Sequence, residues 1–386
     1  METLELRIEK IVYGGSGLAR HEGRVIFVPG VAAGEKVRAS IVKDCKNFLE
    51  AELVEVLEPS PERVTPPCSY VGLCGGCQYQ HLSYREELKW KEAQVRELLT
   101  RHGGVDDTKI SAIVASPSDY GYRSSVTLHR TKPGAVPQRM GFIGRDKTTP
   151  LVIDRCLLTE PQLERVFQWD ENLVRDEDRR TYRIAADGTC MTSRTEQYYR
   201  VKIAGEELVA ATQGFFQNNL AVAEAMTYQA AKWLKSLKAE HVADLYSGVG
   251  LFGLLASPSK ASVTFVEENE MSIQALRMSI ADRPGRRFRV HAARVERAFS
   301  RVMSDAQPAI DTLVIDPPRS GMTRDLCQKI ADAKGLKGIV YISCDPSTLA
   351  RDLKLLATDG RRKVEAVIPF DMFPRTQHIE VMTLLR

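Results

Sequence analysis

The chain has 386 residues, of which 43% are hydrophobic and 27% charged, with a formal net charge of +4. These values are ordinary for a soluble globular protein, and the length predicts two or three domains. No apolar run is long enough to span a membrane, and the N-terminus lacks the basic start and apolar core of a signal peptide, so we expect a cytoplasmic protein. The slight positive charge allows a nucleic-acid partner without requiring one.

Residues 1–58 are predicted to form a small β-barrel. Alternating strand patterns cover 6–11, 24–28, 37–42 and 49–56, and glycine turns separate them. Several short strands at this spacing are typical of barrels of the OB kind. Such barrels often bind single-stranded nucleic acid, but a purely structural barrel fits the pattern equally well.

A proline-rich linker leads into a cysteine-rich segment. Cys68, Cys74 and Cys77 follow the spacing C-x5-C-x2-C, and eight cysteines without an export signal favour metal or catalytic chemistry over disulfides. Three clustered thiolates need a fourth ligand, and either tetrahedral zinc or an iron–sulfur cluster fits. The candidates for that ligand are Cys45, Cys156, Cys190 and Cys327, of which Cys156 follows a strand-like segment at 151–154.

Residues 84–101 read as an amphipathic, charge-rich helix, which we expect to be able to pack on the C-terminal domain. From 113 to about 209 the pattern is one of short strands and turns. Basic residues recur there, and with Phe142 they could hold RNA, although such a set is usually a solvated face. They are Arg123, His129, Arg130, Arg139 and Arg145.

From about residue 215 onward, strands alternate with helical segments, which predicts a doubly wound α/β domain. The strand 242–245 runs into a turn with glycines at 248, 250 and 253, and then a helix. The next strand ends in Glu267, 23 residues after Asp244, the distance at which such folds present a carboxylate to ribose hydroxyls. An acid at Asp244 is more typical of S-adenosylmethionine sites than of dinucleotide sites.

Two further strands end in reactive groups. Asp316 is followed by two prolines that aim it rigidly, and Cys344 follows the buried strand 338–342. Asp345 is a good N-cap and Pro346 suits the first helical position, so Cys344 lies where a strand gives way to a helix. We expect a helix N-terminus to stabilise its thiolate, which favours a nucleophile over an inert core cysteine. Asp316 and Cys344 should share one crevice.

Together these segments resemble the RNA 5-methyluridine methyltransferase family, the RumA/TrmA-like enzymes. The resemblance implies an α/β fold: a Rossmann-like class I methyltransferase domain (211–386), an N-terminal OB-like TRAM barrel (1–58) and a central α+β iron–sulfur domain (59–210). It also implies that a 4Fe-4S cluster is held by Cys68, Cys74, Cys77 and Cys156. Because the reaction has no redox step, we expect this cluster to be structural.

The same resemblance implies the site residues. Residues 215–219 are similar to the family's cofactor-contacting F-x-Q-x-N stretch, Cys344 to its nucleophile, and Glu380, in His378-Ile379-Glu380, to its general base. Asp345 in place of a common asparagine and Ser247 in place of a frequent cysteine depart from the pattern. S-adenosylmethionine is expected to contact Gln217, Asp244, Tyr246, Gly248, Glu267 and Asp316.

The expected function is methylation of uridine C5 in RNA, with ribosomal RNA favoured over transfer RNA, by a protein that we expect to be a monomer. Two other classes compete. A methyltransferase for an exocyclic amine would carry N-P-P-Y where this chain has Asp316-Pro317-Pro318-Arg319. A non-catalytic iron–sulfur RNA-binding protein would not need Cys344 and Glu380 together.

Overall fold

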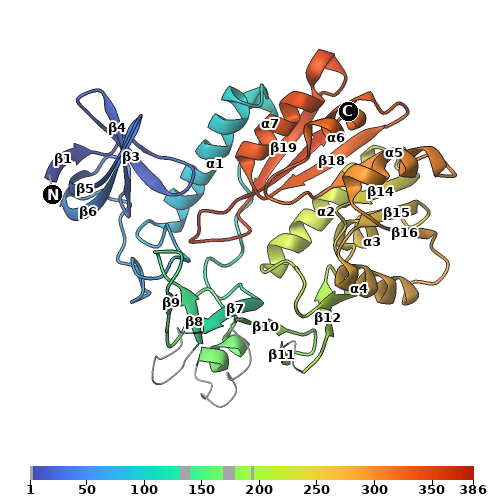
Figure 1. Cartoon of the computed structure of the whole chain (residues 1–386), viewed down its shortest axis with the longest axis horizontal. Coiled ribbons are helices and arrows are strands. Elements are labelled where there is room, and N and C mark those ends of the chain that lie inside the picture. Colours follow the sequence, from blue (N-terminus) through green and yellow to red (C-terminus); the bar gives the residue numbers. More distant parts are fainter. Residues whose placement is uncertain (1–2, 131–139, 168–178, 193–194) are drawn as a thin grey trace.

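The computed structural model describes residues 3–130, 140–167, 179–192 and 195–386, and the elements below belong to this part of the chain. Figure 1 shows an N-terminal barrel, a small central sheet and a C-terminal α/β layer, with helix α1 (Tyr84–Arg101) between the barrel and the α/β layer. Within the described residues, no helix is both long and apolar enough to cross a membrane.

The barrel contains a six-stranded sheet in the order β1-β5-β6-β4-β3-β2. The sequence pattern predicted one strand over 6–11, but the structure has two, because the chain changes its hydrogen-bond partners after Ile8. The amide of Ile8 donates to the carbonyl of Glu35 and its carbonyl accepts from Gly34, whereas the amide of Glu9 donates to the carbonyl of Leu18. The strands are β1 Thr3–Arg7, β2 Lys10–Ile11, β3 Ser16–His21, β4 Arg24–Pro29, β5 Lys36–Cys45 and β6 Phe48–Glu58.

The central region follows α1 and a short helix, η1 (Asp107–Lys109), and has a five-stranded sheet in the order β11-β10-β7-β8-β9. The strand expected over 151–154 ends at Leu151, and Arg139 lies outside the described residues. The elements are β7 Ser125–Arg130, β8 Met140–Ile143, β9 Pro150–Leu151, η2 Pro161–Phe167, β10 Arg179–Ile184 and β11 Cys190–Thr192.

The C-terminal region is a doubly wound layer, as the alternation predicted. A hairpin, β12 (Tyr198–Ile203) and β13 (Glu206–Ala211), packs on α4 beside a seven-stranded sheet ordered β16-β15-β14-β17-β18-β20-β19. The strands are β14 His241–Leu245, β15 Ser262–Glu267, β16 Phe288–Ala292, β17 Thr312–Ile315, β18 Gly338–Ser343, β19 Val364–Phe370 and β20 Glu380–Leu385. The helices are α2 Leu220–Ser236, α3 Leu251–Leu255, α4 Glu270–Ala281, α5 Val295–Asp305, α6 Arg324–Asp332, α7 Pro346–Leu356 and η4 Thr358–Gly360.

Strands β14 to β18 are parallel, whereas β20 runs antiparallel between β18 and β19. Helices cover both faces of this sheet, so β18 is apolar at every position except its last. Val340 and Ile342 join the core beneath α2 and α4, while Ile339 and Tyr341 join the core beneath α5, α6 and α7. Helix α1 packs on α7, and its residues Val95 and Leu99 belong to this second core.

Candidate active site

A cavity of about 910 Å³ opens at the carboxyl ends of the parallel strands, the edge where doubly wound sheets bind ligands. Its lining comes from the glycine loop, the ends of β15, β17 and β18, the segment 215–217 and the start of β20. The structure brings every predicted cofactor and catalytic position to this one cavity: Gln217, Asp244, Tyr246, Gly248, Glu267, Asp316, Cys344 and Glu380.

Cys344 lies between β18 and α7, with Asp345 as the N-cap. The Asp345 carboxylate accepts from the amides of Ser347 (2.8 Å) and Thr348 (3.1 Å), as the sequence predicted. The prediction of a stabilised thiolate is wrong for this resting site. Burial and then the charges of Glu380 and Asp316 raise the Cys344 pKa to about 12. The first amides of α7 donate to the Asp345 carboxylate and not to the Cys344 sulfur. The charge of this carboxylate further disfavours a thiolate.

Glu380 begins β20, and the pairing of Ser343 with Val381 places it beside the end of β18. Its side chain is buried, and burial first, then the charge of Asp316, raises its pKa well above the ordinary value. Burial also raises the pKa of Asp316 to about 7. The site therefore gathers two carboxyl groups and a thiol whose charged forms are all disfavoured.

Arg319 is a positively charged residue that partly offsets the charge of these acids. The sequence analysis named it only as part of a motif and gave it no role of its own. It follows Pro317-Pro318, lines the cavity and opposes the raised pKa values of both Cys344 and Glu380. Its Nη2 lies 3.4 Å from Nδ1 of His378. The sequence signal was present, because the rigid prolines after Asp316 fix where the next side chain emerges.

Two carboxylates hold the glycine loop in place. Asp244 Oδ2 accepts from the amide of Gly253 at 2.8 Å, and Glu267 accepts from the amides of Gly248 (2.8 Å) and Asn269 (2.7 Å). A Cβ on residue 253 would lie 2.6 Å from Asp244 Oδ2, so only glycine permits this contact. Burial raises the pKa of Asp244 well above its usual range.

Two polar atoms of the cavity wall are candidates to bind a ligand. Within the described residues, Gln217 Oε1 and Ser247 Oγ are buried with no hydrogen-bond partner, which is unusual for buried polar atoms. Phe215, at the rim, is 69% exposed. The Tyr246 hydroxyl donates to Glu296, and this hydrogen bond holds the ring in the wall of the cavity. These features suit a ligand with polar groups at one end and a flat ring at the other.

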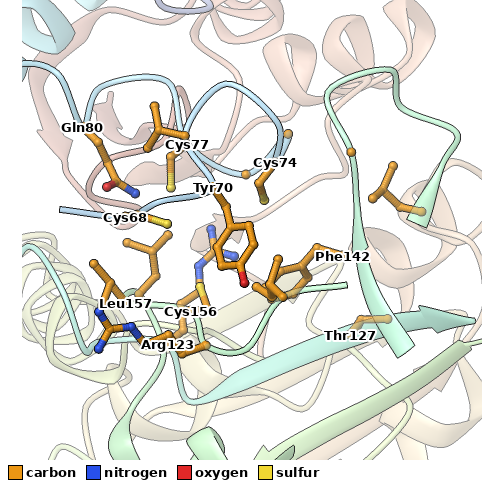
Figure 2. A pocket seen from close by; sticks show the side chains of 18 of the residues that line it. Cys68, Tyr70, Cys74, Cys77, Gln80, Arg123, Thr127, Phe142, Cys156 and Leu157 are labelled. Carbon is orange, nitrogen blue, oxygen red and sulfur yellow. The ribbon is translucent and has the colours of Figure 1, made fainter. Parts of the chain in front are cut away.

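Four cysteines line a second cavity, of about 320 Å³, in the central region. Figure 2 shows Cys68, Cys74 and Cys77 on the loop before α1, with Cys156 opposite on the segment after β9. The loop is held in place by hydrogen bonds from Gly75 N to Ile143 O (3.3 Å) and from the Tyr70 hydroxyl to Asp154 (2.9 Å). Gly75 passes so close to the Gly144 carbonyl that an added Cβ would lie 3.0 Å from its oxygen.

Burial dominates the electrostatics of this second cavity. It raises the pKa of Cys77 to about 12 and also raises those of Cys74 and Cys156, while the Arg123 guanidinium opposes each shift. Arg123 Nε and Gln80 Oε1 are buried there without a hydrogen-bond partner in the part of the chain described. As they stand, no three His, Cys, Asp or Glu side chains among the described residues are arranged to hold a metal ion.

The comparisons with known proteins agree with this architecture. Residues 195–386 match the family model described as tRNA (Uracil-5-)-methyltransferase, and residues 1–54 match the TRAM domain. In fold the chain is similar to the Pyrococcus abyssi tRNA (uracil-54, C5)-methyltransferase in complex with S-adenosyl-L-homocysteine. The TM-score is 0.75 at 22% identity, over 99% of this chain and 100% of that one. The fold is thus that of a class I S-adenosylmethionine-dependent methyltransferase carrying a TRAM barrel.

Two relatives extend the likeness over nearly the whole length. An RNA methyltransferase of Bdellovibrio bacteriovorus is 32% identical, over 99% of this chain and 95% of that protein. The 23S rRNA (uracil(1939)-C(5))-methyltransferase RlmD of Chromohalobacter salexigens is 31% identical, over 98% and 88%. The chain belongs to the family of RNA (uracil-C5)-methyltransferases, and it is an enzyme of that class.

Proposed function

We propose that this enzyme methylates C5 of a uridine in ribosomal RNA, with Cys344 as nucleophile and Glu380 as general base. The observation that carries the proposal is that both residues line one cavity with the glycine loop and Asp316. Ribosomal RNA is favoured over transfer RNA because the relative named for 23S rRNA is 31% identical over nearly the whole chain. The structural neighbour named for transfer RNA is 22% identical.

The cavity suits S-adenosylmethionine, which supplies an electrophilic methyl group when bound. Gln217 Oε1 and Ser247 Oγ offer unpaired acceptors and donors to its polar groups. Glu267, at the end of β15, would bind the ribose hydroxyls, and Asp244 accepts from the loop on which the cofactor would lie. Asp316, Tyr246 and Gly248 complete the wall.

In the proposed mechanism, Cys344 adds to uracil C6, and the ring becomes an enolate with electron density at C5. The thiol is protonated at rest, since its pKa is about 12, so its proton must leave as the S–C6 bond forms. We assign the acceptor of this proton to Asp316, whose pKa is about 7 and whose charge bears on the thiol, so that Glu380 stays ionised for the later step. Arg319 balances the negative charge that the step creates.

C5 then takes the methyl group as that group's bond to the donor sulfur breaks, and Glu380 removes the proton that remains on C5 and later passes it to water. The C6–S bond breaks to release the Cys344 thiolate, which regains its proton from Asp316. The buried position and raised pKa of Glu380 make its carboxylate a stronger base than an exposed glutamate. The target base must leave any stack to reach this cavity. Its C6 must then face Cys344, so the methyl donor lies on the side of Gln217 and Glu267.

We also propose that Cys68, Cys74, Cys77 and Cys156 hold a 4Fe-4S cluster that shapes the central region. The four thiols are the cysteines that line one cavity, and Arg123 could offset the negative charge of a thiolate-bound centre. Burial raises the pKa of Cys74, Cys77 and Cys156, so binding of a metal centre should release protons. Soft thiolate ligands also suit zinc, so metal content must decide.

The activity is tested with labelled S-adenosylmethionine and RNA from cells that lack this protein. Wild type should form 5-methyluridine in ribosomal RNA, Cys344→Ala should form none, and Glu380→Gln should stay covalently attached to RNA. Label in transfer RNA would change the substrate and keep the chemistry. If wild type that binds the cofactor labels no RNA, or if Cys344→Ala retains activity, the proposal fails.

The metal centre is tested on protein purified without oxygen. Iron and acid-labile sulfide in equal amounts, lost in Cys156→Ser and kept in Cys190→Ser, would support the cluster. Cys190 is a fair control because it lies on β11 and is not part of the cavity lining. Zinc without sulfide, or metal retained by Cys156→Ser, would overturn the assignment.

A further inference from the structure

A tyrosine from the N-terminal barrel packs against the C-terminal core next to the strand that begins at Glu380. Tyr13 sits in the turn between β2 and β3, which the amide of Gly15 closes by donating to the Val12 carbonyl at 2.9 Å. The ring is partly buried and packs against the core of the C-terminal sheet, not against the core of the barrel. Burial and the charges of Asp345 and Cys344 raise its pKa. The barrel therefore reaches into the catalytic region.

The turn is held in this position from several sides. An added Cβ on Gly15 would lie 2.8 Å from Gln78, and one on Gly14 would lie 3.7 Å from Gln377, so the turn lies against the segment that leads to Glu380. On the other side of the turn, β2 is attached to α1. Lys10 Nζ lies 2.6 Å from Glu97, and Gln94 donates to the Ile11 carbonyl.

The position of Tyr13 indicates which ligand its ring contacts, the cofactor or the RNA. The cavity on one side of Cys344 is lined by the proposed cofactor residues, and Tyr13 is not part of that lining. Its ring packs against the core that contains Ile379 and Val381, the two neighbours of Glu380, so it lies near the catalytic end of the cavity but outside the cofactor residues. A target base that reaches Cys344 must pass this region. Aromatic rings there can stack on unpaired bases.

We propose that Tyr13 is a positioning residue: its ring supports the target uridine or the nucleotide next to it, so that docking of the barrel and methyl transfer are coupled. The inference rests on the proposed function. It assigns to the barrel a direct part in placing the base, beyond general binding of RNA.

The kinetic test compares Tyr13→Ala, Tyr13→Phe and Lys10→Ala. Tyr13→Ala should lower kcat/KM for RNA by about ten- to a hundredfold, the range expected for one lost base stack, with unchanged affinity for S-adenosylmethionine. Tyr13→Phe keeps the ring and should restore the rate to within about threefold of wild type. Lys10→Ala loosens the barrel without removing the ring, so an equal loss in that variant would overturn the proposal.

Ultraviolet crosslinking tests the placement without turnover. A photoreactive phenylalanine analogue at position 13 should crosslink to the methylated uridine or its immediate neighbour in ribosomal RNA, in wild-type and Cys344→Ala backgrounds alike. Crosslinks only at distant nucleotides, or none, would refute the inference. If wild type forms 5-methyluridine but Tyr13→Ala keeps full kcat/KM, the inference alone fails. If wild type forms none, the proposed function fails, and the crosslink still reports where Tyr13 meets RNA.

Discussion

The Nζ of Lys91 lies 2.6 Å from Oδ1 of Asp371, and neither side chain is exposed to solvent. Lys91 belongs to α1, and Asp371 follows β19, so the pair joins segments 280 residues apart. Lys91 also contacts Glu87 at 2.8 Å and the Phe373 carbonyl at 3.1 Å. The segment after Asp371 leads directly to Glu380, so this buried ammonium helps to fix the strand that carries the proposed base.

Replacing Lys91 by methionine should destabilise the protein strongly. The substitution keeps the volume but leaves Asp371 buried without its cation and Glu87 paired with Arg375 alone, a loss of about 3–5 kcal/mol of stability for a broken buried pair. The loss of stability should become smaller as pH falls, because the buried carboxylates can then be protonated. Thermal unfolding at several pH values measures this. Lys89→Met is the control, since Lys89 is 64% exposed, and it should cost at most about 0.5 kcal/mol.

Alkylation of Cys344 should become faster with pH throughout the neutral range. Because its pKa is about 12, the thiolate fraction grows about tenfold per pH unit between pH 7 and 9. Asp316→Asn removes one of the charges that raise this pKa and should speed alkylation, whereas Arg319→Gln should slow it. Timed iodoacetamide labelling with mass spectrometry of the Cys344 peptide gives the rates. The Cys190 peptide should be unaffected by either variant. A plateau by pH 8 would contradict the raised pKa.

Asp316→Asn should stabilise the folded protein above pH 7. The folded-state pKa of Asp316 is about 7, above its ordinary value of 3.8, so ionisation opposes folding. The penalty is fully present above pH 7 and disappears gradually as pH falls towards 4. We expect the free energy of unfolding to rise by about 1–3 kcal/mol at pH 8. This is less than the whole pKa difference would give, because the carboxyl group is partly exposed to solvent. Asp325→Asn removes an exposed carboxylate of α6 that pairs with Lys329, so it should give no gain and cost at most about 0.5 kcal/mol. An equal gain at pH 4.5 and pH 8 would disprove this account.

Gln217→Leu should have opposite effects on ligand binding and on stability. The buried Oε1 atom of Gln217 has no partner among the described residues, so removing it should leave thermal stability unchanged or slightly higher. Loss of the amide should weaken S-adenosylmethionine binding about tenfold, the cost of one unmade hydrogen bond to a charged ligand. Calorimetric titration and thermal unfolding measure the two effects. Gln328→Leu, on the exposed face of α6, should alter neither. Unchanged affinity in Gln217→Leu would remove this residue from the cofactor site.

Local signals were read correctly from the sequence. The cap at Asp345, the helix over 84–101 and the glycine loop each depend on neighbouring residues, and each lies where it was predicted. The class of enzyme is also confirmed. The roles of the individual site residues and the cluster remain predictions.

Other features depend on contacts between distant segments, and the sequence could not give them. The raised pKa of Cys344 comes from burial and from Glu380, 36 residues later, so the helix terminus alone was misleading. Spacing alone left four candidate partners for the three clustered cysteines. The family resemblance named Cys156, and the fold brings Cys156 to their cavity. Tyr13 gave no sequence signal, because its neighbours in space are more than 300 residues away.

The position of β20 has a consequence for synthesis of the enzyme. This strand comes last in the sheet's sequence order, yet it is inserted between β18 and β19, and its first residue is Glu380. A nascent chain can therefore complete the barrel, the cysteine loop and the parallel strands while β18 still lacks its antiparallel neighbour. Until residues 380–385 emerge and are inserted, the thiol of Cys344 has no base beside it. Until that step, the growing chain lacks the group that we propose completes the methylation cycle after the thiol has attacked.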